Sequence, residues 1–129
     1  MAQVQLNILL KVNSHGNGHK ENTLKFERGT LGLARQDYTI YYYYTGDASY
    51  LTKGYNSGCT QFFITAEDCS DKFDGYYCAF GKVIEGMEVA DEIVNAKRDW
   101  DDKPYEDQTI KSMTVETFGE EYKEPVIIE

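Results

Sequence analysis

The segment QFFIT at residues 61–65, followed by FDGYYCAFGKVIEGM at residues 73–87, is the most informative part of the chain. Aromatic and β-branched residues are concentrated at 61–65 and 76–83, and this enrichment is typical of strands. The Asp74-Gly75 dipeptide between them is a turn signal. We therefore expect two strands here, joined by a short connection.

The sequence on either side predicts further strands and a helix. Residues 29–35, GTLGLAR, predict a strand with its two leucines on one face. Residues 4–12 and 110–118 are also interpreted as strands, although the apolar run at 4–12 is too short to separate a strand from a buried helix. After Gly86, apolar residues recur at the spacing of an amphipathic helix of roughly three turns. The chain is therefore expected to be mainly β with one or two helices.

Residues 37–55 are unusually rich in tyrosine, with a turn signal at Thr45-Gly46-Asp47. Tyrosine often lines binding surfaces, because its ring offers a large contact area at a low cost in entropy. The alternative is a long loop or hairpin whose rings only cover the edge of the sheet. We favour the loop or hairpin and leave the binding surface open.

The 129 residues suit one domain. A net charge of -9 argues against nucleic acid or an anionic membrane as partner, since both require a basic face. No run is apolar enough to span a membrane and the N-terminus is a poor signal peptide, so a cytoplasmic location is expected. Residues 1–20 form an atypical N-terminal segment, 21–118 the domain, and 119–129 a charged tail.

No pattern in the sequence predicts a cofactor or a metal site. His15 and His19 flank glycines in an expected loop, and the acidic residues 99–107 lack the spacing of an EF-hand. The cysteines match no zinc spacing and are expected to be buried or half-buried thiols, with a disulfide or redox role as the alternative. These cysteines are Cys59, Cys69 and Cys78.

Four blocks of sequence occur in the order in which one known family carries them. They are NTLKFERGTL at 22–31, YNSGCTQFFI at 55–64, FGKVIEGM at 80–87 and PYEDQ at 104–108. Together they resemble the cyclophilins, a family of peptidyl-prolyl cis-trans isomerases, over about residues 21–118. One block can arise by chance, but four in the right order make coincidence a poor explanation.

The resemblance implies a closed eight-stranded antiparallel barrel capped by helices, with a proline pocket on its outer face. This chain matches only the later strands and the later helix, so an incomplete barrel is expected. By resemblance, Phe63 forms the pocket floor, Phe73 a second wall, and Gln61 presents its amide to the substrate backbone. The remaining substrate-binding residues implied in this way are Ala34, Arg35 and Tyr77.

The family's catalytic arginine belongs to an earlier Phe-His-Arg segment, which is not found in this sequence. Rotation about an X-Pro bond faces a barrier of ~18–20 kcal/mol, because amide resonance must be broken. Catalysis needs an apolar pocket, exclusion of water and a hydrogen bond that weakens the resonance, and no nucleophile or metal. Only Arg28, Arg35 and Arg98 are present, and only Arg35 is expected near the pocket. No catalytic residue is therefore assigned, and weak or absent catalysis is expected.

The resemblance leaves three hypotheses open: a prolyl isomerase acting on proline-containing peptides or unfolded proteins, a module that binds X-Pro segments without turnover, and a truncated gene product without function. Cyclosporin binding is expected to be weak, because Lys72 falls roughly where sensitive members carry a tryptophan. An incomplete barrel exposes strand edges, so self-association through these edges is a further expectation.

Overall fold

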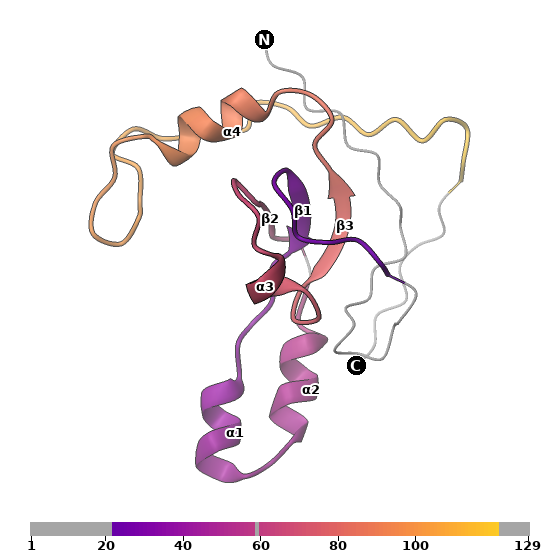
Figure 1. The fold of residues 1–129 in the computed structure, drawn as a ribbon, viewed down its shortest axis with the longest axis vertical. Coiled ribbons are helices and arrows are strands. Elements are labelled where there is room, and N and C mark those ends of the chain that lie inside the picture. Colours follow the sequence, from indigo (N-terminus) through magenta and orange to yellow (C-terminus); the bar gives the residue numbers. More distant parts are fainter. Residues whose placement is uncertain (1–21, 59, 122–129) are drawn as a thin grey trace.

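The computed structural model describes residues 22–58 and 60–121 (Figure 1). Three strands form one antiparallel sheet in the spatial order β2-β1-β3, with the bounds β1 Thr30–Leu33, β2 Phe62–Ile64 and β3 Cys78–Lys82. The helices are α1 Thr39–Thr45, α2 Ser49–Tyr55, α3 Ser70–Phe73 and α4 Met87–Val94. The strands predicted at 29–35, 61–65 and 76–83 and the helix predicted after Gly86 are confirmed, each over a shorter span.

The described strands form an open sheet rather than a closed barrel. Figure 1 shows the α1–α2 pair beyond one end of this sheet and α4 beyond the other. Within the described residues there are more helices than the one or two expected, because the tyrosine-rich region is helical and α3 lies in the connection between β2 and β3. None of the helices in this part of the chain has the length and apolar character needed to cross a membrane.

The central strand β1 is fixed at its start by backbone hydrogen bonds to both neighbours. Gly29, at φ +83°, donates its N–H to the Thr65 carbonyl (2.7 Å) and accepts from the Val83 N–H (2.7 Å). The buried Thr65 hydroxyl accepts from the Thr30 N–H (3.0 Å) and donates to the Glu27 carbonyl. Because these polar groups are paired, this buried end of the sheet carries little desolvation cost.

The core around the sheet is small. Its fully buried large side chains are Phe26 and Leu31, joined by the smaller Ala79 and Val83. Cys78 is buried and Cys69 is half-buried, which agrees with the burial expected for the thiols. The third thiol, the segment 4–12 and both histidines lie outside the described residues.

Of the long loop or hairpin expected at 37–55, the structure shows a hairpin, and its two arms are the helices α1 and α2. The turn signal itself is correct: Gly46 closes α1 at φ +70° and donates to the Tyr42 carbonyl (2.8 Å). The rings of Tyr38 and Tyr41 lie 5.8 Å apart, and Tyr41 stacks on Tyr50 of α2 at 5.6 Å. Packing of rings between the helices therefore overrides a composition that favours strand or loop.

The prediction of a final strand at 110–118 is also wrong, because these residues have no regular structure. Their alternating apolar side chains are exposed, with Ile110 at 67% and Val115 at 64%. An alternating pattern identifies a face that suits a sheet, but a strand also needs a neighbour to pair its backbone. No strand among the described residues pairs with this segment.

Each of the three shorter helices begins with a hydrogen bond from the backbone N–H of its first residue to the carboxylate of an aspartate two positions earlier. The pairs are Thr39 with Asp37, Ser49 with Asp47 and Ser70 with Asp68. The Ser49 N–H, and then its side chain, lowers the pKa of Asp47 below its usual value. The side chains of Thr39 and Ser70, followed by their N–H groups, lower the pKa values of the other two carboxyls. The ionised carboxylates therefore stabilise these helix starts.

We predict that the far-ultraviolet circular dichroism of the helices weakens as the pH falls below about 4. A carboxyl whose pKa is lowered by folding stabilises the protein above its unfolded pKa, and this stability is lost as the pH falls through the lower folded pKa. The variant Asp47→Asn keeps an uncharged hydrogen-bond acceptor and should lose less signal in acid than the parent. A helical signal unchanged down to about pH 2 would contradict this account of the helix starts.

Candidate functional site

Four aromatic rings from separate segments meet on one face of the sheet. Phe63 of β2 stacks on Phe26, which precedes β1, with ring centroids 5.7 Å apart and planes 16° from parallel. Phe73 of α3 and Tyr77, which precedes β3, meet the Phe63 ring edge-on at 5.5 and 5.4 Å. Such offset and edge-on pairs are favourable beyond the area that they bury. We call these four residues the aromatic cluster.

The cluster depends on a glycine in the central strand. Gly32 of β1 lies directly opposite Phe63 of β2. A Cβ atom at Gly32 would lie 2.4 Å from Cζ of Phe63 and 2.6 Å from Cε1 of Phe26. Because Gly32 has no side chain, the two stacked rings can occupy the space that a Cβ atom would fill.

Asp74 holds α3 against the segment that carries Phe26. Its carboxylate accepts the N–H of Phe26 (2.9 Å) and pairs with Lys25 (3.2 Å). At the other end of α3, the Cys69 N–H donates to the Phe26 carbonyl (2.8 Å). These contacts at both ends of the short helix fix the position of Phe73.

Phe63 and Phe73 also line an open groove of about 490 Å³. Asp91 and Val94 of α4 also line this groove. Arg28 ties α4 to the start of β1, because both of its terminal nitrogens bind the Asp91 carboxylate, at 2.9 and 2.6 Å. The hydrogen bonds of this pair lower the pKa of Asp91 and raise that of Arg28.

Arg35 lies beside the cluster and is held on several sides. Its guanidinium carbon lies 5.1 Å from the ring centre of Tyr77 and 4.8 Å from that of Tyr55. Its Nε donates to the Tyr76 carbonyl (2.9 Å) and its Nη1 to the Gln36 carbonyl (3.1 Å). Contacts between a guanidinium and two tyrosine rings stabilise one orientation of the side chain.

The six residues named from the sequence are only partly brought together. Three of them belong to the aromatic cluster, and Arg35 contacts it through Tyr77. Ala34 and Gln61 extend the pairing of β1 and β2, since the Ala34 N–H donates to the Gln61 carbonyl (2.8 Å). Gln61 is exposed, and it lines neither the groove at Phe63 nor the second cavity described below.

Sequence reasoning missed the ring beneath Phe63. Phe26 is 1% exposed and carries the stacking contact, yet the resemblance assigned it no role. It lies within the block NTLKFERGTL at 22–31, and this was the available signal. Tyr55 and Tyr76, which hold Arg35, were also not assigned.

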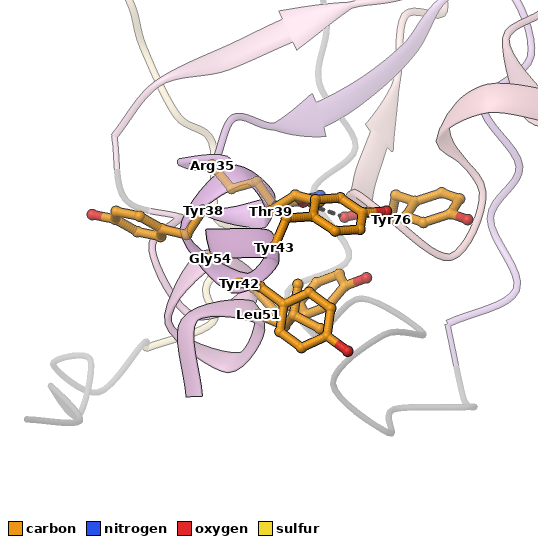
Figure 2. A pocket seen from close by; sticks show the side chains of 9 residues that line it. Arg35, Tyr38, Thr39, Tyr42, Tyr43, Leu51, Gly54 and Tyr76 are labelled. Carbon is orange, nitrogen blue, oxygen red and sulfur yellow. Dashed lines mark hydrogen bonds between the residues drawn. The ribbon is translucent and has the colours of Figure 1, made fainter. Parts of the chain in front are cut away.

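A second cavity, of about 200 Å³, lies between Arg35 and the α1–α2 hairpin (Figure 2). Its walls include Tyr38, Tyr42 and Tyr43 of α1 and Leu51 of α2. The buried Gly54 allows α2 to approach, since a Cβ there would lie 3.1 Å from the Gln36 carbonyl oxygen. Within residues 22–58 and 60–121, no group of three or more histidine, cysteine or acidic side chains is arranged to hold a metal ion.

We predict that Gly32→Ala destabilises the chain by about 1–3 kcal/mol, because the new methyl group must displace Phe63 and Phe26. Unfolding in urea, followed by tyrosine fluorescence and circular dichroism, measures this loss. Adding Phe63→Leu to Gly32→Ala should recover part of it, since the smaller side chain leaves room for the methyl group. Wild-type stability of Gly32→Ala would contradict the packing described here.

Comparison with known proteins identifies a family that matches most of the chain. The family described as cyclophilin type peptidyl-prolyl cis-trans isomerase/CLD matches residues 10–115. Peptidyl-prolyl cis-trans isomerase B of Saccharomyces cerevisiae is 34% identical over 71 residues, which cover 55% of this chain and 35% of that protein. Human peptidylprolyl isomerase domain and WD repeat-containing protein 1 is 43% identical over 63 residues, covering 48% of this chain and 10% of that protein.

NK-tumor recognition protein of Mus musculus is 32% identical over 88 residues, covering 63% of this chain and 6% of that protein. This chain thus spans between 6% and 35% of the length of these three relatives. No solved structure matches the chain significantly. Because the family match covers more than half of the chain, this protein belongs to the cyclophilin-type peptidyl-prolyl cis-trans isomerase family.

Proposed function

We propose that this chain binds X-Pro peptide segments at the aromatic cluster and isomerises them slowly or not at all. The observation that carries the proposal is the Phe63 ring, which is held by three other rings and still borders an open groove. Proline rings dock well on preformed aromatic surfaces, because little conformational entropy is lost on either side. Membership of the prolyl isomerase family supports the same ligand.

The proposal of weak catalysis rests on the positions of the three arginines. Arg28 binds Asp91, and Arg98 binds Asp102 (2.9 Å) after the end of α4. Arg35 already donates from Nε and Nη1 to backbone carbonyls. A catalyst of X-Pro rotation must direct a donor at the prolyl nitrogen when resonance is lost, and such a preorganised donor is worth a few kcal/mol. Arg35 keeps the N–H groups of Nη2, but its hydrogen bonds and the two tyrosine rings fix its guanidinium beside Tyr77. Turning it toward a proline over Phe63 would break these contacts.

Two alternatives remain within the same proposal. A module that grips X-Pro segments without turnover needs only the groove and the cluster, and both are present. A gene product without function is favoured if the chain does not hold its rings in place in solution. The small core and the many exposed apolar side chains of residues 100–118 are the features that favour this last reading.

We predict that the chain binds the peptide N-acetyl-Ala-Ala-Pro-Ala-amide and leaves its cis-trans exchange rate close to the uncatalysed one. Phe63→Ala should weaken binding roughly tenfold, because it removes the ring on which the proline rests. Phe62→Ala is the matched control, since Phe62 is the neighbouring ring on the opposite face of β2 and is 38% exposed.

Nuclear magnetic resonance titration and exchange spectroscopy in one sample give both the dissociation constant and the exchange rate. Equal weakening by the two variants would contradict binding at the cluster. Exchange accelerated to the level of an efficient isomerase would contradict the proposed lack of a catalytic donor. A spectrum without dispersed methyl and amide signals would favour the product without function.

We also propose that cyclosporin binds this chain weakly, because Lys72 occupies, by resemblance, the place of a tryptophan in sensitive family members. Lys72 is exposed on α3, directly before Phe73 of the cluster. Lys72→Trp should tighten cyclosporin binding roughly tenfold, as expected for an added aromatic contact at the centre of an interface. Titration calorimetry measures the change, with Lys111→Trp as control. Equal affinity of the parent and Lys72→Trp would contradict this alignment.

A further inference from the structure

The cavity between the α1–α2 hairpin and Arg35 is distinct from the groove at Phe63. Figure 2 shows the side chains that line it, with a dashed line joining Arg35 to Tyr76. Its volume of about 200 Å³ accommodates one side chain rather than a whole peptide. The residues that form its wall are Arg35, Tyr38, Thr39, Tyr42, Tyr43, Leu51, Gly54, Tyr55 and Tyr76.

The chemistry of this wall favours an anionic group. Every polar side chain in it is a guanidinium or a hydroxyl and can donate a hydrogen bond. Arg35 is the one charged side chain among these lining residues, and no carboxylate is present in the wall. A carboxylate placed here would therefore meet one cation and several donors, with no like charge in contact.

Arg35 retains donors for such a ligand. Its hydrogen bonds to the described residues use Nε and Nη1, which leaves the two N–H groups of Nη2. The hairpin's own carboxylates are engaged elsewhere, since Asp37 accepts from the Thr39 N–H and Asp47 from the Ser49 N–H. Neither aspartate lines the cavity, although the pKa of Asp37 is lowered first by its hydrogen bonds with Thr39 and then by the nearby charge of Arg35.

Arg35 also connects the cavity to the aromatic cluster. Its guanidinium lies between Tyr77, which belongs to the cluster, and Tyr55, which lines the cavity. The Phe63 and Tyr77 ring centres are 5.4 Å apart, and the guanidinium carbon is 5.1 Å from the Tyr77 ring centre. An extended peptide advances about 3.3 Å per residue, so the two places are at most about three residues apart along a bound peptide.

From these contacts we infer that the hairpin cavity is a second subsite, which selects peptides carrying an acidic residue two or three positions from the proline. This inference rests on the proposed binding of proline over Phe63. The carboxylate of a substrate Glu or Asp binds Nη2 of Arg35, and the tyrosine rings cover its methylene groups. The tyrosine-rich hairpin thus supplies specificity to a pocket that otherwise recognises only the proline.

The test compares Glu with Gln, which has nearly the same shape and no charge. Four peptides of seven residues carry one proline at the centre and alanine elsewhere, with Glu or Gln placed two positions before or after the proline. Amide-resolved nuclear magnetic resonance titrations of the whole chain give the dissociation constants. We expect the Glu peptide to bind roughly fivefold more tightly than its Gln counterpart at one of the two positions, as for a single partly exposed charge pair.

Two variants locate the effect. Arg35→Gln should remove the preference for Glu, and Tyr43→Ala should reduce it by opening the wall of the cavity. Tyr44→Ala is the matched control, because Tyr44 is the neighbouring residue, is 85% exposed and does not line the cavity. The Glu peptide should also shift the amide signals of Tyr42 and Gly54, which the Gln peptide leaves nearly unchanged.

The outcomes separate this inference from the proposed function. Equal binding of the Glu and Gln peptides, with shifts confined to the aromatic cluster, would overturn the second subsite and leave the proline site intact. Loss of binding by all four peptides would overturn both. Unchanged Glu binding after replacing the proline by alanine would retain a carboxylate site at Arg35 and overturn its link to proline recognition.

Discussion

The stacking of Phe63 on Phe26 across the bare backbone of Gly32 is the contact on which the rest of the described structure depends. It joins β2 to the segment before β1, and the edge-on ring of Phe73 adds α3 to the same assembly. Each aromatic pair contributes about 0.5–1.5 kcal/mol beyond its buried area. Among the described residues only two large side chains are fully buried, so these pairs form a large share of the packing there. The surface proposed to bind proline is thus also the surface that holds the sheet together.

The parts of the fold that sequence reasoning found are those encoded by local patterns. The strands around Leu31, Phe63 and Ala79 and the helix after Gly86 follow from side-chain type and period. The failures are segments whose conformation depends on distant partners. Tyr41 and Tyr50 make a helical hairpin by stacking on each other, and the alternating residues 110–118 have no neighbouring strand in the described part of the chain. A single sequence specifies such partners only weakly.

The candidate site shows the same division. Resemblance placed Phe63, Phe73 and Tyr77 in one pocket, and the structure brings their rings within 5.5 Å of one another. It did not single out Phe26, although this residue belongs to the block at 22–31, because the block does not show which of its side chains is buried beneath the site. It also did not foresee that Arg35 lies between two tyrosine rings. In the proposed function, binding and catalysis separate physically. The rings suffice for binding, whereas catalysis needs a donor directed at the prolyl nitrogen, and Arg35 is instead held by the Tyr76 and Gln36 carbonyls.

The most direct test of the central claim is an intermolecular nuclear Overhauser experiment on the chain with a short X-Pro peptide labelled at the proline. The account predicts contacts from the proline ring protons to the ring protons of Phe63 and Phe73, and none to Phe62 on the opposite face of β2. Proline contacts found only elsewhere on the chain, with Phe63 unaffected, would contradict it.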